Sequence, residues 1–374
     1  MGDNAAVDDY QGLVEVADQG PEGLYEYFSE RGWGDGLPLV APTHERVEES
    51  LSHADGDPDE PVAILSPRDG VAPRRAVAVN AVLAGCRPEY LPVVLTAVRA
   101  LGHQQVNLRG VNATTHPVAP LSIVHGEVVD ALGFNAGLGA FGPGTRANAT
   151  VGRAVRLVLL HVAGARPGPG DASTQGQPSK YTYCVAENSA ESPWEPYHRS
   201  VGVEAPSAVT VHCGENPHNF HDMESDRIER ILDKAASAMA TFGVNNACIS
   251  GGEWFIGLCP EHAAVADVDG WGRADVAAYL FEHARLPVRA CPASRVGVPG
   301  PVRPAGLGRL DAGGRRRDPA AYDPGTRQHP GLRDRGARQT LMRYSQLGDD
   351  PQCDPSGSGL RWQAGVHGDP DLLA

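Results

Sequence analysis

Apolar residues recur at helical spacing through Val71–Leu101, and the pattern breaks once, at Gly85-Cys86-Arg87-Pro88. Gly85 is suited to end the first helix, because glycine adopts the left-handed conformation without a Cβ penalty. Pro88 is suited to the first turn of a second helix, where its missing N–H is not needed. The pattern therefore predicts two helices joined by a turn that carries Cys86.

The rest of the chain alternates short apolar runs with amphipathic segments. Short runs that predict strands lie at Leu37–Ala41, Val62–Leu65, Val118–Val124, Val209–His212 and Trp254–Leu258. Segments with helical periodicity lie at Gly23–Arg31, Thr43–Leu51, Thr145–Ala163, Asp222–Phe242 and Arg273–Arg285. This alternation predicts an α/β fold, in which helices pack on a mixed sheet and the C-terminal tail is irregular.

Composition shifts suggest five regions. An acidic extension at 1–22 precedes a first α/β unit at 23–166, a Gly/Pro/Ser-rich connection at 167–200 and a second α/β unit at 201–287. The tail at 288–374 holds 13 arginines and 9 aspartates but no lysine, glutamate, isoleucine or phenylalanine. We expect this tail to be disordered, because so little apolar area offsets the ordering entropy. Its composition is also that of a GC-rich gene read out of frame, which is the second explanation that we consider.

Charge and cysteine usage limit the class of protein. The formal net charge of -14 argues against nucleic acid and anionic membranes as partners. No apolar run reaches the ~20 residues of a membrane span, and we see no signal peptide. Seven dispersed cysteines without a C-x-x-C pair favour a reducing cytoplasm over a disulfide framework or a zinc knuckle. We therefore expect a cytoplasmic protein.

Cys86 is the first candidate for chemistry. It lies beside Arg87 and just before a predicted helix N-terminus, where Glu89 complements the helix dipole, and both a cation and a helix N-terminus favour a thiolate. The alternative is a packed apolar residue in a turn between helices, as most free cysteines are.

A glycine-rich stretch is the second candidate. Gly137, Gly139, Gly142 and Gly144 precede the helix predicted from Thr145, whose first turn holds Arg146 and Asn148. Backbone N–H groups at such a helix start can bind an anion. The alternative is a tight connection beneath a packed helix.

Two polar loops complete the candidates. One holds Asn112, Thr115 and His116, and it suits either a ligand surface or ordinary turn hydrogen bonds. The other, at 212–222, is dense in His, Cys, Glu and Asp and contains His218 and Asn219. Its spacing matches no standard zinc pattern, so we predict no metal site and favour His218 as an acid, base or hydrogen-bond donor.

Several motifs resemble those of one uncharacterised bacterial family, which is associated with small UGSC-type domains that carry a cysteine or selenocysteine. They are N-A-V-L-A-G-C-R-P-E-Y-L-P-V-V-L, N-A-T-T-H-P-V-A-P-L, G-P-G-T-R-A-N-A-T-V-G-R-A-V-R-L, N-P-H-N and G-G-E-W…P-E-H-A…D-G-W, spread over 32–285. The resemblance supports these positions without assigning roles: Cys86, Glu89, Asn112, Thr115, Arg146, Asn148, His218 and Asn219. Relatives continue with a Gly-Lys-His-Ser block that this chain lacks in frame.

These patterns favour a thiol-dependent enzyme, oxidoreductase-like, that acts on a small anionic molecule without a cofactor. Cys86 is then the nucleophile or redox thiol, His218 the acid/base, and the glycine-rich stretch with Arg146 the anion binder. Two alternatives stay open. One is a cofactor-free lyase or hydrolase that uses His218 with Glu215 or Glu261. The other is a non-catalytic subunit that binds a thiol/selenol domain protein.

Overall fold

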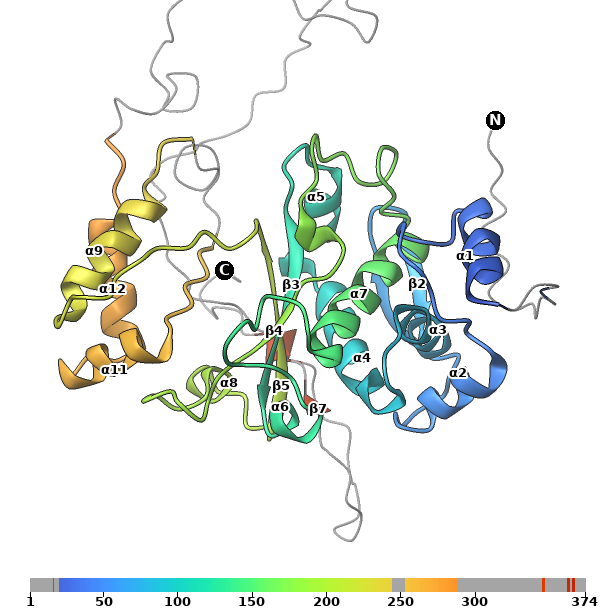
Figure 1. Ribbon diagram of the computed structural model, residues 1–374, viewed down its shortest axis with the longest axis horizontal. Coiled ribbons are helices and arrows are strands. Elements are labelled where there is room, and N and C mark those ends of the chain that lie inside the picture. The colour runs from blue at the N-terminus through green and yellow to red at the C-terminus, as the bar shows by residue number, and fades with distance from the viewer. Residues whose placement is uncertain are drawn as a thin grey trace, which may run out of the picture. The chain divides into compact units, whose positions relative to one another are not determined.

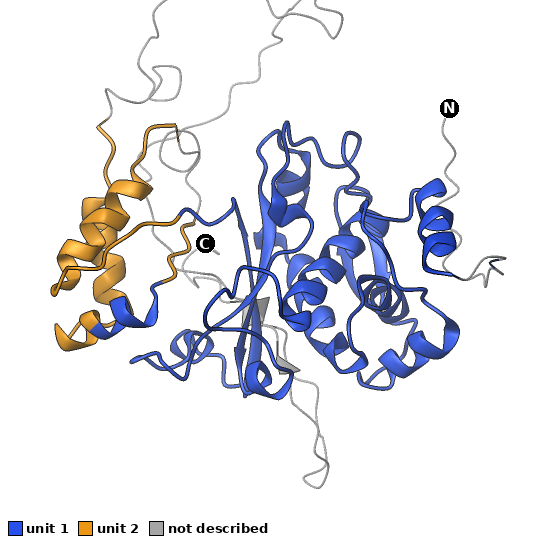
Figure 2. Cartoon of the chain, viewed as in Figure 1, with its two compact units in different colours: residues 1–218, 258–264, 342–374 blue, residues 219–257, 265–341 orange. Residues whose placement is uncertain are grey.

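The computed structural model describes residues 20–243 and 253–287, together with Val16 and the backbones of three short strands at 345–346, 362–363 and 365–366. The chain divides into two compact units (Figure 2). Unit 1 comprises residues 1–218, 258–264 and 342–374, and unit 2 comprises residues 219–257 and 265–341.

A four-stranded mixed sheet organises unit 1, in the order β4 (Cys184–Ala186), β3 (Ala119–Gly126), β5 (Ser207–Gly214) and β7 (Trp362–Gln363). β3 pairs with β4 in parallel and with β5 in antiparallel fashion, and β5 pairs with β7 in parallel. Seven of the eight β3 residues are buried, as expected of a strand covered on both faces. The predicted α/β fold with a mixed sheet is confirmed.

Helices α4 (Leu91–Leu101) and α7 (Arg146–His161) pack on this sheet, and α3 (Arg74–Ala84) packs against both of them (Figure 1). The buried faces of these three helices form most of one hydrophobic core. Unit 1 also contains α1 (Pro21–Glu30), α2 (His44–Leu51), the β1 (Pro61–Leu65) and β2 (Gly70–Pro73) hairpin, α5 (Leu108–Ala113), α6 (Val128–Ala131) and α8 (Tyr197–Ser200).

Unit 2 contains α9 (Ile228–Met239) and α12 (Arg273–His283), which pack against each other. The amphipathic face of α9 buries Ile228, Ile231 and Leu232, as its spacing predicts. Helix α11 (Pro260–Val268) crosses from unit 1 to unit 2 after Ala264.

The sharpest local prediction holds at the end of α3. Gly85 lies in the left-handed region at φ 87°, and the N–H of Cys86 donates to the Ala81 carbonyl at 3.0 Å. This is the hydrogen-bond pattern of a glycine-terminated helix. The following Pro88–Tyr90 segment forms a 3₁₀ turn before α4, so the second helix begins later than predicted.

Other expectations differ from the structure. Leu37–Ala41 is not a strand, because the Val40 N–H donates to the Leu83 carbonyl at the end of α3 instead of to a sheet. Trp254–Leu258 is not a strand either. The predicted division near residue 200 also differs, because β5 pairs with β3 along its full length and so belongs to unit 1.

The tail prediction concerns residues 288–374. Of these, the structure describes the backbones of β6 (Ser345–Gln346), β7 and β8 (Gly365–Val366). The remainder of the tail lies outside the described residues.

Candidate functional site

The structure brings two of the predicted features together, the Cys86 turn and the start of α7. The Arg146 Nε donates to the Gly85 carbonyl at 2.9 Å, and the Cys86 thiol hydrogen-bonds with Thr150, one turn further along α7. Arg146 is exposed and forms no ion pair with any described carboxylate. A thiol, a hydroxyl and a guanidinium therefore meet at one helix N-terminus.

The surroundings of Cys86 oppose the predicted thiolate. Burial raises the pKa of the Cys86 thiol to about 12, and the opposing effects of Thr150 and Arg146 are smaller. The neighbouring Arg87 lies 3.8 Å from the Glu89 carboxylate, which takes up part of its charge. The thiol is therefore neutral near pH 7, because desolvation outweighs the nearby cation.

The buried thiol leads to a direct prediction about labelling. With iodoacetamide at pH 7.5, we expect Cys86 to react more slowly than the exposed Cys259, because the thiolate is the reacting species and Cys86 is the less exposed of the two. Site-resolved mass spectrometry of a labelling time course measures both rates in one sample. Faster labelling of Cys86 than of Cys259 would contradict this account of its burial.

The glycine-rich loop has a structural explanation for part of its sequence. Asn148 is buried, accepts a hydrogen bond from the Asn135 N–H at 2.8 Å, and donates to the Asn135 and Ala140 carbonyls. It therefore holds the loop closed instead of facing a ligand. Gly142 and Gly144 are exposed, and the backbone at position 144 has a φ of 119°, which favours glycine. Arg146 is the member of this predicted anion site that remains available.

Asn112 and Thr115 lie in a different part of unit 1. Asn112 belongs to α5, not to a loop, because Asn107 caps that helix by accepting from the Gly110 N–H. Its side chain is buried and donates to the Ser66 carbonyl at 3.0 Å. The carbonyl of Thr115 accepts from the Thr174 backbone at 2.9 Å. Both residues therefore hold the segment that ends in His116.

His116 forms the second chemical feature of unit 1. Its Nε2 lies 2.5 Å from the Glu215 Oε1, and the two side chains are 25% and 51% exposed. The sheet explains this pairing: Ala119, near the start of β3, faces Gly214, at the end of β5. Residues that flank those two strand ends therefore meet, although they lie far apart in sequence.

Three segments are hydrogen-bonded together around this pair. Gln177 donates to the Gly214 carbonyl at 3.1 Å and accepts from the Asn216 N–H at 2.8 Å. The Tyr183 hydroxyl donates to the Glu215 carbonyl at 2.7 Å. These contacts hold the backbone on both sides of Glu215, so the carboxylate is presented from a supported turn.

A buried cluster of charged side chains adjoins these hydrogen-bonded segments. The Asp171 carboxylate binds the Arg156 Nη2 at 3.0 Å and the Lys180 Nζ at 2.7 Å, and all three side chains are at least 89% buried. Lys180 follows Ser179, whose N–H donates to the Asn216 side chain. The cluster therefore carries one excess positive charge and adjoins the loop that hydrogen-bonds with Asn216, next to Glu215.

His218 and Asn219 are both exposed. Glu215, which one alternative used together with His218 for acid–base chemistry, hydrogen-bonds with His116. Sequence reasoning also missed a group formed by His125, Glu187 and His198, in which both histidines are buried. These three come from separate segments with no local spacing pattern, and the only sequence signal is a histidine within the apolar run P-L-S-I-V-H-G.

None of the helices in the described residues is long and apolar enough to cross a membrane. Comparisons with protein-family models, with curated proteins and with solved structures each found no match.

Proposed function

We propose that the protein is an acid–base enzyme, a hydrolase or lyase, that acts on a small anionic molecule. His116 is the general base and acid, and Glu215 is the residue that positions it. The observation that carries this proposal is the short hydrogen bond between a partly exposed imidazole and a carboxylate that is itself held by a supported turn.

The tautomer of His116 follows from this contact. An ionised carboxylate only accepts hydrogen bonds, so the Glu215 pairing places the ring proton on Nε2 and leaves the lone pair on Nδ1. Nδ1 makes no hydrogen bond to any described residue. His116 is thus an imidazole base that the Glu215 carboxylate holds in place and whose Nδ1 lone pair is available, as proton transfer requires.

The charge cluster supports an anionic substrate. Two buried cations share the single carboxylate of Asp171, so their field is only half neutralised. The cluster adjoins the loop 177–181, which is hydrogen-bonded to the residues on either side of Glu215. An incoming carboxylate or phosphate is favoured by such a field.

Turnover tests this proposal. The wild-type chain is assayed with a panel of small carboxylate and phosphate esters and of small hydroxy acids, for hydrolysis and for elimination. We expect His116→Gln to lower kcat/KM by about 100-fold or more for any substrate that is turned over, and Glu215→Gln to lower it less. His44→Gln, at an exposed position on α2, is the control. Full activity of His116→Gln would refute the assignment.

A second candidate function keeps the thiol. Cys86, Thr150 and Arg146 meet at the start of α7, and a substrate that binds Arg146 would lie beside the thiol. In that reading the protein is a thiol-dependent enzyme, or the partner of a thiol/selenol domain protein, in the cytoplasm. Loss of turnover in Cys86→Ser with full turnover in His116→Gln would favour it over the first proposal.

A further inference from the structure

His198 occupies an unusual position for a polar side chain. It lies on α8, only 1% exposed, and neither ring nitrogen has a hydrogen-bond partner among the described residues. Among the described residues, the Ala205 backbone is the group that approaches the ring as a hydrogen-bond partner would. An unpaired buried polar group is destabilising. The contacts of His198 within the polypeptide therefore do not explain why a histidine stands at this position.

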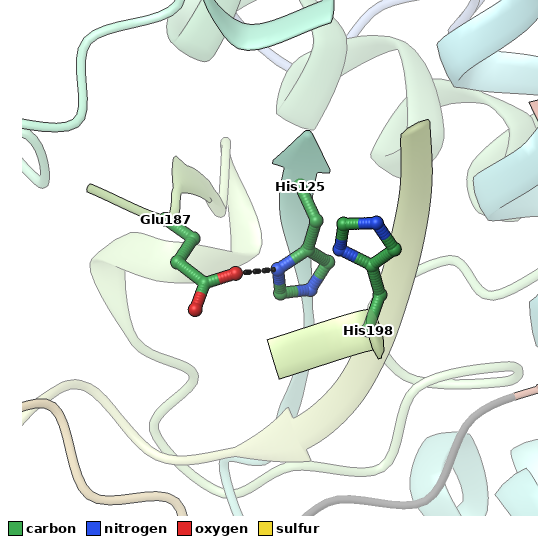
Figure 3. A group of neighbouring side chains, drawn as sticks. All are labelled: His125, Glu187 and His198. Atoms are coloured by element: carbon green, nitrogen blue, oxygen red, sulfur yellow. Dashed lines mark hydrogen bonds and ion pairs between the residues drawn. The ribbon is translucent and has the colours of Figure 1, made fainter. Parts of the chain in front are cut away.

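The neighbours of His198 are metal-binding residue types. His125 lies near the end of β3 and Glu187 directly follows β4, and Figure 3 shows the three side chains converging. One ligand atom from each residue lies within 4.8 Å of the others. Ligand atoms around one Zn²⁺ lie roughly 3–4 Å apart, given bonds of about 2.0–2.2 Å. The separations within the group, 4.8 Å at most, lie close to that range.

The surroundings hold the two other side chains in place. The His125 Nδ1 lies 2.7 Å from the Glu187 Oε2, and its Nε2 lies 2.9 Å from the Thr210 hydroxyl. The Glu187 carboxylate also accepts from the Tyr197 N–H at 2.9 Å. Metal-binding histidines characteristically use their other nitrogen in a hydrogen bond that fixes ring orientation, and the Thr210 contact of His125 has that form.

We propose that His125, Glu187 and His198 bind a divalent transition-metal ion, for which Zn²⁺ fits the donor set best. Two imidazoles and one carboxylate are borderline ligands that suit zinc, and three protein ligands leave a fourth position for water or substrate. A hydrogen-bonded His125–Glu187 pair alone accounts for two of the residues, whereas a metal ion accounts for all three. The sequence alone predicted no metal site.

The site is separate from the proposed catalytic pair, because His116 precedes the start of β3 and His125 lies near its end.

Cobalt binding to the full chain tests the proposal. The protein is stripped with EDTA and titrated with Co²⁺, whose visible d–d bands report coordination number, and then with Zn²⁺ in competition. We expect one Co²⁺ per chain with intense four-coordinate bands, and displacement by Zn²⁺. His198→Gln and Glu187→Gln should each weaken binding roughly tenfold or more, whereas His44→Gln should leave it unchanged.

Two further measurements make each outcome decisive. Circular dichroism identifies which of the two variants keeps the wild-type fold, and Zn²⁺ should raise the Tm of the stripped wild-type chain by mass action whether or not either variant folds. His116→Gln separates this site from the His116–Glu215 pair. The proposal is overturned if the wild type binds no Co²⁺ and shows no Zn²⁺-dependent Tm shift. It is also overturned if folded His198→Gln binds Co²⁺ as tightly as the wild type does, or if Co²⁺ binding is lost in His116→Gln but not in His198→Gln or Glu187→Gln.

Discussion

Replacing Asp171 by Ala is expected to lower the free energy of unfolding by about 3–5 kcal/mol. The Asp171 side chain is 3% exposed and neutralises Arg156 and Lys180, which are 9% and 11% exposed. Burial alone would raise the pKa of Asp171, but the Lys180 hydrogen bond and charge outweigh it and hold that pKa below its usual range. Without the carboxylate, two cations stay buried with no counter-charge, which is the expensive way to break an ion pair.

A surface pair provides the matched control for Asp171. Glu204 lies 2.9 Å from Arg199, but its side chain is 85% exposed. We expect Glu204→Ala to change the free energy of unfolding by about 1 kcal/mol or less, because solvent screens such pairs. Urea unfolding of both variants with equal m-values makes the comparison. A loss in Asp171→Ala no greater than that in Glu204→Ala would contradict the buried-cluster description.

Replacing Asp35 by Ala is expected to have an effect of similar size, about 3–5 kcal/mol. The Arg153 Nε and Nη2 each donate to the Asp35 carboxylate at 2.8 Å, and the two side chains are 14% and 4% exposed respectively. This bidentate contact ties the loop after α1 to α7. The Asp35 carboxylate also accepts a hydrogen bond from the Leu37 N–H at 3.1 Å, which forms an Asx turn. Chemical unfolding of Asp35→Ala measures the loss.

The same residue predicts a pH dependence. Burial would raise the pKa of Asp35, but the Arg153 hydrogen bonds and charge outweigh burial and hold that pKa below the usual 3.8. The pair therefore stabilises the folded state fully above about pH 4, and the stabilisation is lost as the pH falls further through the folded pKa. The difference in unfolding free energy between wild type and Asp35→Ala should be constant from pH 7 to 5 and narrow below 4. A constant difference down to pH 2 would contradict this.

Local signals in the sequence predicted the elements well. Gly85 ends α3 as expected, the Thr43 side chain accepts from the Arg46 N–H at the start of α2, and the apolar run at 118–124 is β3. Each of these depends on residues within one turn or one strand. The segment at 37–41 was misassigned because its hydrogen bond goes to Leu83, a partner that no local pattern reveals.

The candidate site was less accessible to sequence reasoning, because its chemistry depends on long-range pairing. The register of β3 against β5 brings Glu215 to His116, and not to His218, which follows Glu215 by three residues in the sequence. The desolvation of the Cys86 thiol, which packs against the core, keeps it neutral although a cation and a helix terminus lie beside it. Sequence spacing reports neither strand register nor desolvation.

The reactivity of His116 with diethyl pyrocarbonate tests the central claim most directly, because it needs no substrate. Carbethoxylation requires an accessible ring nitrogen with a free lone pair, which the Glu215 contact leaves on Nδ1. Rates are measured at pH 7 by peptide mass spectrometry in wild type and in Glu215→Gln, with His44 as the internal reference. We predict that His116 reacts at least as fast as the more exposed His44, and that Glu215→Gln slows His116 severalfold while His44 is unchanged. A His116 rate that is the same in both proteins would contradict the assignment of the pair.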